Sequence, residues 1–212
     1  MSLITLTDPR SPVSEAYRTL RTNLSFYSLD NPLRTLVVTS PAPDEGADEA
    51  AANLAVTMAQ SGKRTILVEC DLRRPSLHTL FGQAAEPGLT DMILGDSELP
   101  LQKTEVENLW LLTSGPQPPN PADLLGSGRT DEIIAKLGQE ADIILFHAPP
   151  VIAVTDATVL GSKVDGVLLV IQAGKSRRDH AQRAKEMLAK ANVRIVGVTL
   201  TNAPDDGLMG SY

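Results

Sequence analysis

The sequence predicts an α/β fold in three layers, with a doubly wound, mostly parallel sheet lying between two layers of helices. Short apolar segments alternate with segments of helical periodicity along the chain, and most of the apolar segments lack alternating polar residues. Strands that are apolar on both faces are typical of a parallel sheet covered on both sides. We therefore expect a single domain over residues 1–212, with a loose arm at 1–11 and a tail at 205–212.

Apolar runs and helical spacings place the individual elements in order. Buried strands are expected over residues 35–39, 65–68, 109–113, 142–146, 166–172 and 193–199. Helices are expected over residues 14–26, 49–60, 77–81, 90–94, 122–125, 130–137, 156–160 and 178–191. Ala16, Leu20 and Leu24 form one apolar face of the first helix, and Ser14 is its expected cap. Gly62 gives the second helix its stop signal.

Composition indicates an acidic globular chain. Of its 212 residues, 42% are hydrophobic, and the formal net charge is −7. No apolar run approaches the about 20 residues of a membrane-spanning helix. The acidic balance gives no support to nucleic-acid binding, so we expect no nucleic-acid partner. One cysteine, Cys70, excludes an intramolecular disulfide and fits a reducing compartment; its apolar context predicts a small core residue.

The stretch 39–54 joins the first predicted strand to the second predicted helix and has the frame of a P-loop. A working P-loop surrounds phosphate with backbone N–H groups and a helix N-terminus, while a Lys reaches the outer phosphates and a Ser/Thr hydroxyl binds Mg²⁺. Here Gly46 is followed by Ala47 and Asp48, so that lysine and that hydroxyl are missing. Four carboxylates lie where an anion would bind: Asp44, Glu45, Asp48 and Glu49.

Polar residues also mark the ends of several predicted strands. They include Pro41, Asp71, His147 and Asn202. Because the carboxyl ends of parallel strands meet at one edge of a sheet, we expect a single site there. Glu69, Asp71 and His147 are a mixed carboxylate and imidazole set of the kind that binds transition metals, which makes a metal site one hypothesis. A hydrogen-bonded or solvated His147 is the alternative.

Four stretches taken together resemble one known family. They are SPVSEAYRTLR at 11–21, ILVECDLRRP at 66–75, TSGPQPPNPADLL at 113–125 and DIILFHAPP at 142–150. In this order they are similar to the N-terminal helix, the second acidic motif, the loop before the fourth region and the Walker B strand of bacterial tyrosine kinases that regulate capsule and exopolysaccharide export. Those kinases belong to the MinD/ParA-like P-loop ATPases. The resemblance runs from about residue 11 to residue 204.

The resemblance implies that the catalytic positions are degenerate. The family has a Lys at the place of Ala47, a Ser/Thr at Asp48, and Asp at both Glu69 and His147. In the family, the Lys contacts the phosphates and the Ser/Thr holds Mg²⁺. The Asp at the place of Glu69 lies near the attacking hydroxyl, and the Asp at the place of His147 supports Mg²⁺ through water. Of the family's two aspartates at positions 69 and 71, only Asp71 is retained. Because each such interaction is worth about 2–4 kcal/mol, little catalysis is expected. No cofactor is expected either, with ATP and Mg²⁺ bound only if the degenerate site still accepts them.

The resemblance also points to a contact surface on the first helix. Glu15, Arg18 and Arg21 match the Glu-x-x-Arg-x-x-Arg motif that joins neighbouring kinase subunits into a ring, so homo-oligomerisation through this helix is expected. A solvated charged face is the alternative. Arg73 and Arg74 are matched as well, and either contact a partner or phosphate or are simply solvated.

Two residues near the C-terminus have counterparts in the family. Kinases of this family carry a tyrosine-rich tail that a neighbouring subunit phosphorylates. Here the corresponding stretch has one tyrosine, Tyr212, which is either an acceptor for another kinase or a tyrosine without such a role. Asn202 lies where related ATPases place an Asn that reads the nucleotide base. An ordinary strand-end cap is the alternative for Asn202.

Three functional hypotheses follow. The favoured one is a catalytically impaired, tyrosine-kinase-like domain that regulates or assembles a system for exopolysaccharide, capsule or lipopolysaccharide biosynthesis and export. The others are an active protein-tyrosine autokinase and a metal- or ligand-binding module. The first implies a cytoplasmic location at the inner face of the membrane. Its partners would be a membrane adaptor or an upstream transmembrane half of a polysaccharide co-polymerase, and an active paralogue.

Overall fold

The computed structural model describes residues 3–30, 32–95 and 98–203, and within them a seven-stranded sheet with the order β3-β4-β2-β5-β1-β6-β7. The strands are β1 (Thr35–Thr39), β2 (Thr65–Glu69), β3 (Gln102–Lys103), β4 (Leu109–Leu112), β5 (Ile143–His147), β6 (Gly166–Gln172) and β7 (Ile195–Thr201). The helices are α1 (Ile4–Thr7), α2 (Pro12–Asp30), α3 (Ala47–Gln60), α4 (Leu77–Leu80), α5 (Leu89–Leu94), α6 (Pro121–Gly126), α7 (Gly128–Glu140), α8 (Asp156–Gly161) and α9 (Arg178–Lys190).

The predicted doubly wound, mostly parallel sheet is confirmed. β1 pairs with β5 and β6, β2 pairs with β4 and β5, and β6 pairs with β7, all in parallel. The antiparallel edge strand β3 was not predicted, because two residues are too short to show a period.

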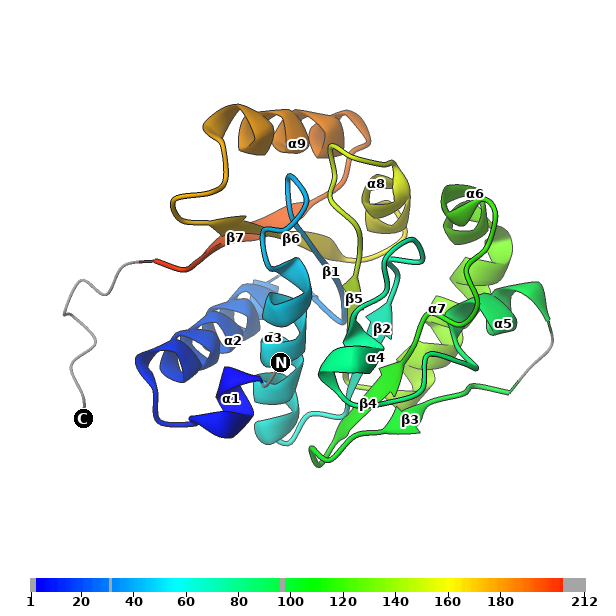
Figure 1. Cartoon of the computed structure of the whole chain (residues 1–212), viewed down its shortest axis with the longest axis horizontal. Coiled ribbons are helices and arrows are strands. Elements are labelled where there is room, and N and C mark those ends of the chain that lie inside the picture. The colour runs from blue at the N-terminus through cyan, green and yellow to red at the C-terminus, as the bar shows by residue number, and fades with distance from the viewer. Residues whose placement is uncertain (1–2, 31, 96–97, 204–212) are drawn as a thin grey trace.

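Helices cover both faces of the sheet (Figure 1). Successive side chains of a strand point to opposite faces, and β1 shows this clearly. Leu36 and Val38 pack with α2, α3 and α4, whereas Val37 packs with the core under α5 to α9. Both cores are fully closed around β1, since these three side chains have no exposed surface. This two-sided burial explains why the strand reads as a continuous apolar run.

The N-terminal segment is the main correction to the predicted elements. Instead of a loose arm over residues 1–11, α1 packs against α3, and Thr5 donates a hydrogen bond from its Oγ1 to Asn53 Oδ1 at 2.8 Å. Ser14 does not cap α2. It lies inside the helix, fully buried, and donates to the Asp8 carbonyl at 2.8 Å. Ser11 accepts a bond from the Ser14 N–H at 3.2 Å, which is the capping bond of a helix that begins at Pro12.

Two further expectations concern the ends of the chain and the membrane. The tail at 205–212, with Tyr212, lies outside the described residues. Within the described ranges, no helix combines the length and the apolar character that crossing a membrane requires.

Candidate functional site

A pocket of about 360 Å³ opens at the carboxyl ends of β1, β2 and β5. It is lined by the loop between β1 and α3, by the segment that follows β2 and by the segment that follows β5. The structure therefore brings Asp44, Glu45, Asp48, Asp71 and His147 together around one hollow, at the edge of the sheet where ligands of open α/β folds bind.

The loop keeps the backbone shape of a phosphate-binding loop. Gly46 has a left-handed φ of 76°, and α3 begins directly after it, two residues earlier than predicted. Asp44 also adopts a positive φ of 58°, a conformation in which Asp is tolerated better than most residues. The backbone N–H groups of Gly46, Ala47 and Asp48 have no hydrogen-bond acceptor in the described part of the chain. The donors that would surround an oxyanion are thus still in place.

The carboxylates of the loop differ in their local contacts. Glu45 is buried, and its Oε2 accepts a hydrogen bond from the Ala42 N–H at 3.3 Å. Asp48 accepts from the N–H of Glu49 at 2.9 Å. Lys175, which precedes α9, donates from its Nζ to the backbone carbonyl of Asp44. The loop therefore contacts a lysine that no feature of the loop sequence indicated.

Glu69 and His147 form a buried pair at the floor of the pocket. They lie opposite each other in the register of β2 and β5, and His147 Nδ1 is 2.8 Å from Glu69 Oε1. Three backbone N–H groups also donate to Glu69, from Asp71 at 2.9 Å, Ser76 at 2.9 Å and Leu77 at 3.0 Å. Glu69 has no exposed surface. Both of its oxygens are therefore occupied by protein donors, including the first N–H groups of the α4 turn.

The pair with Glu69 favours the charged form of His147. Burial by itself disfavours the imidazolium, but the Glu69 carboxylate and its hydrogen bond act in the opposite direction, and the pKa of His147 is raised overall. Asp48 and Asp71 raise it further through their charges. An imidazole side chain held by Glu69 thus lies at the position where the resemblance predicts an Asp that supports Mg²⁺.

The raised pKa of His147 predicts that the stability gained from protonating this residue in the folded state is lost in alkaline solution. Its contribution should be complete below the unfolded pKa of about 6.5 and disappear as pH rises through the higher folded pKa, because only the folded state then keeps the proton. We expect the difference in unfolding free energy between the unmodified chain and His147→Asn to shrink from about pH 6.5 upward. Urea unfolding at a series of pH values measures it, and a constant difference would contradict the assignment.

The metal hypothesis for Glu69, Asp71 and His147 is not supported. Across residues 3–203, apart from the undescribed positions, no group of three or more His, Cys, Asp or Glu side chains is arranged to hold a metal ion. The physical reason is that Glu69 already accepts four hydrogen bonds. Asp71 Oδ1 likewise accepts the N–H groups of Arg73 and Arg74, at 3.1 and 2.9 Å.

Arg73 and Arg74 have different surroundings. Arg73 forms a two-point ion pair with Asp156, through Nε at 2.9 Å and Nη2 at 3.1 Å. Asp156 is fully buried at the start of α8, and the pair ties the segment after β2 to that helix. Sequence reasoning missed Asp156 because its partner lies 83 residues away. Arg74 is exposed and lines the pocket.

The remaining predicted site residues lie away from the pocket. Arg18 pairs with Glu15 at 2.9 Å and also donates to the Pro9 carbonyl at 2.7 Å. Arg21 donates to the Thr57 carbonyl of α3 at 3.2 Å. Both arginines are therefore engaged within the chain, and Glu15 remains the exposed member of the motif. Asn202 follows the edge strand β7, has a positive φ of 51° and does not line the pocket.

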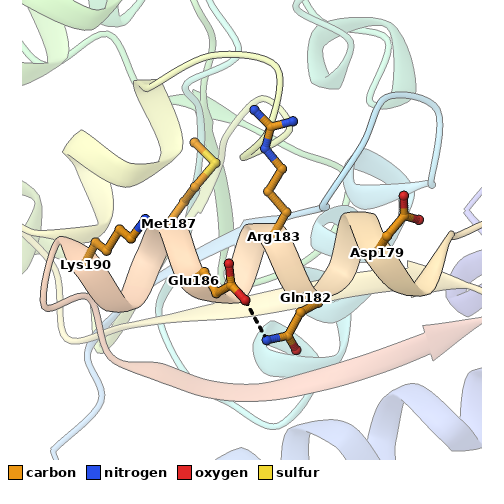
Figure 2. Close-up of a pocket in the computed structure, with 6 residues that line it drawn as sticks. All are labelled: Asp179, Gln182, Arg183, Glu186, Met187 and Lys190. Atoms are coloured by element: carbon orange, nitrogen blue, oxygen red, sulfur yellow. Dashed lines mark hydrogen bonds between the residues drawn. The ribbon is translucent and has the colours of Figure 1, made fainter.

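A second hollow, of about 620 Å³, lies on the outer face of α9. Figure 2 shows its six lining side chains, all of which come from this one helix: Asp179, Gln182, Arg183, Glu186, Met187 and Lys190. Two acidic and two basic side chains balance one another, and Gln182 donates to Glu186 at 2.8 Å. With one wall and no excess charge, this surface is not a candidate site.

The strand order, the loop between β1 and α3 and the pocket at the strand ends define a domain of the P-loop NTPase type. The structure of the septum site-determining protein MinD from Pyrococcus horikoshii, complexed with Mg-ADP, superposes with a TM-score of 0.67 at 23% identity. It covers 79% of this chain and 70% of that one, and it shows the fold alone. The predicted P-loop-like fold class is thereby confirmed.

Relatives with higher sequence identity identify the family within this class of protein. No family model matches the chain. Tyrosine-protein kinase YwqD of Bacillus subtilis is 42% identical over 201 residues, which are 94% of this chain and 85% of that protein. Putative tyrosine-protein kinase CapB of Staphylococcus aureus is 36% identical, covering 93% and 88%. The kinase domain of Escherichia coli tyrosine kinase ETK has a TM-score of 0.90 at 30% identity, covering 95% and 80%.

This chain belongs to the family of bacterial tyrosine-protein kinases, as its sequence motifs predicted. Some relatives are much longer. The chain is 31% identical to tyrosine-protein kinase Wzc of Salmonella typhimurium but spans 28% of that protein.

Proposed function

We propose that this chain is a catalytically impaired, tyrosine-kinase-like domain that regulates or assembles an exopolysaccharide or capsule export complex. The observation that carries the proposal is the buried pair of Glu69 and His147. Family resemblance implies Mg²⁺ and ATP at this pocket, but the donor set does not fit the metal. Both Glu69 oxygens already accept hydrogen bonds, and the His147 nitrogen nearest to Glu69 is engaged with it, so neither group is free to support the metal.

The phosphate side of the pocket supports the same conclusion. Ala47 offers no ammonium group to the outer phosphates, and Asp48 replaces the neutral hydroxyl with a negative charge. Phosphoryl transfer depends almost wholly on positioning and on stabilising charge. Removing the cation and the metal ligand together therefore removes most of what the fold could contribute to catalysis, although such losses are not additive.

The assembly role rests on family membership. The Wzc relative is several times longer than this chain, which supports a membrane adaptor or an upstream transmembrane half as the partner, with the domain at the inner face of the membrane. A homo-oligomer through the exposed Glu15 side of α2, or a complex with an active paralogue, would place the domain in the same assembly. Light scattering at high protein concentration checks self-association, and a monomer there would count against it.

An active autokinase remains the second candidate, because relatives at 42% and 36% identity carry kinase names and the loop backbone is intact. Calorimetric titration with Mg·ATP, run beside a phosphotyrosine assay, separates the two. We expect no saturable heat and no phosphotransfer from the unmodified chain. Micromolar Mg·ATP affinity together with phosphotyrosine formation would establish the active kinase and overturn our proposal.

A further inference from the structure

The strand β7 forms an outer edge of the sheet, with α9 on one face and α2 on the other (Figure 1). Among the described residues it pairs only with β6. The Thr201 carbonyl accepts the Ala173 N–H, so the backbone groups of Thr201 point toward β6. Because backbone groups alternate between the two edges of a strand, those of Val198 and Leu200 point outward. Their N–H and C=O groups are therefore available to a further strand.

The same two residues carry exposed apolar side chains. Val198 is 57% exposed and Leu200 is 52% exposed. Their register partners in β6 are Leu169 and Ile171, and Leu169 belongs to the core under α9. Since register partners share a face of the sheet, Val198 and Leu200 lie on the α9 side, beyond the surface that this helix covers. With these apolar side chains and no charged residue, β7 lacks the features by which sheets usually protect an edge.

The side of α9 that faces this edge is basic. Figure 2 shows Arg183 and Met187 directed to the side of the helix away from β7. At 3.6 residues per turn, Arg178 and Lys185 share the opposite side, which faces the edge strand. Both are exposed, and neither forms an ion pair in the described part of the chain. Two unpaired cations therefore lie beside the apolar edge.

This positive charge is local. Residues 175–190, which comprise the turn before α9 and the helix itself, hold six basic and two acidic side chains. Their formal charge is +4 in a chain whose formal net charge is −7. The two acidic side chains, Asp179 and Glu186, belong to the outer face of α9 described above. A segment that pairs with β7 therefore meets apolar side chains and, beside them, cations without acidic neighbours on the same side of the helix.

We propose that β7 is the docking edge for an extended acidic segment of a partner protein, which joins the sheet as a further strand. Main-chain bonds to β7 supply affinity, and alternate side chains supply specificity. Arg178 and Lys185 are about 10 Å apart along the helix axis, close to the about 13 Å between residues i and i+4 of a strand. The segment that fits carries acidic, apolar and acidic side chains at alternate positions, with the apolar one against Val198 and Leu200.

A second copy of this chain fits the edge less well. Antiparallel pairing of two β7 strands about a two-fold axis perpendicular to the sheet keeps both α9 helices on the same face. Their basic sides would then face each other, and like charges at close range repel. The docking edge is also separate from the Glu15 side of α2. The proposal therefore depends neither on self-association through α2 nor on the catalytic state of the pocket.

Amide hydrogen exchange of the full chain, followed by NMR, tests the proposal with the heptapeptide acetyl-TETVTET-amide. When this peptide is extended, its two Glu side chains and its Val side chain fall on one face. We expect it to slow exchange at the amides of Val198 and Leu200 in a saturable manner. The peptide TKTVTKT should bind about tenfold more weakly or less, because two attractions become repulsions.

Matched variants separate the contribution of charge from that of backbone pairing. Lys185→Glu should weaken the Glu peptide about three- to tenfold and strengthen the Lys peptide. Lys190→Glu changes the net charge equally but on the outer face of α9, and it should leave both affinities unchanged. Val198→Pro removes an outward N–H without removing a bond to β6, and it should abolish binding. Val198→Thr keeps that N–H and should weaken binding much less.

Several outcomes would overturn the proposal. Slow exchange at Val198 and Leu200 in the dilute chain without peptide would show that the chain itself covers the edge. Exchange that slows only as the chain concentration rises would assign the edge to a second copy. No binding of either peptide, or equal binding of both, would exclude an acidic partner segment. Circular dichroism checks that Val198→Pro is folded, and if it is not, an affinity unchanged by Lys185→Glu decides against the proposal.

Discussion

A fourfold variant that combines Ala47→Lys, Asp48→Ser, Glu69→Asp and His147→Asp is expected to gain Mg·ATP binding and tyrosine phosphotransfer. The backbone of the loop is already in the required shape, with Gly46 in the left-handed region and free N–H groups at the start of α3. The pocket lacks the charged and polar side chains that the family places around phosphate and Mg²⁺. Restoring a cation, a metal ligand and two short carboxylates should raise phosphotransfer by at least about 10³-fold, since single groups of this kind are worth about 10²–10³.

The matched control is the double variant with Ala47→Lys and Asp48→Ser alone. Because the Glu69 and His147 pair still fills the metal side of the pocket, this variant should stay close to the unmodified chain in Mg²⁺-dependent activity. Calorimetry with Mg·ATP and phosphate transfer to a tyrosine peptide measure both variants. If the double variant were as active as the fourfold one, the result would contradict the role that we propose for the buried pair.

Glu69→Ala is expected to be the most destabilising single substitution at the site. It removes the acceptor of three backbone N–H groups and leaves the buried His147 ring without its hydrogen-bond partner. Breaking a buried ion pair in this way costs about 3–5 kcal/mol. In a chain of this length that corresponds to a fall in Tm of about 6–20 °C. Thermal unfolding followed by circular dichroism measures the fall.

Two further variants make the Glu69 result specific. Glu132→Ala removes an exposed carboxylate that pairs with Arg129 on α7, and it should change stability by no more than about 0.5 kcal/mol. The double variant Glu69→Ala, His147→Ala should lose less stability than the sum of its single variants, because it also removes the buried ring that has lost its partner. A loss below about 1 kcal/mol for Glu69→Ala would show that the pair is not a stabilising element.

The fold followed closely from local signals. Two-sided apolar runs such as 36–38 indicated a buried parallel strand, and the structure confirms that Val37 packs on one face of the sheet while its neighbours pack on the other. The strand β3 escaped prediction because two residues show no period. The loose arm predicted over residues 1–11 is wrong for the described part of that segment, because its order comes from Thr5 contacting Asn53, which lies 48 residues away.

The sequence by itself determined the family, since an ordered set of motifs can be read directly. It also determined that the P-loop lysine and the Ser/Thr hydroxyl are replaced, by Ala47 and Asp48. Only the tertiary structure decided where the charges point. Glu45 turns inward, Lys175 reaches the loop from the turn after β6, and Glu69 meets His147 between paired strands. These contacts depend on side-chain direction and on strand register between distant segments, which a linear pattern does not contain.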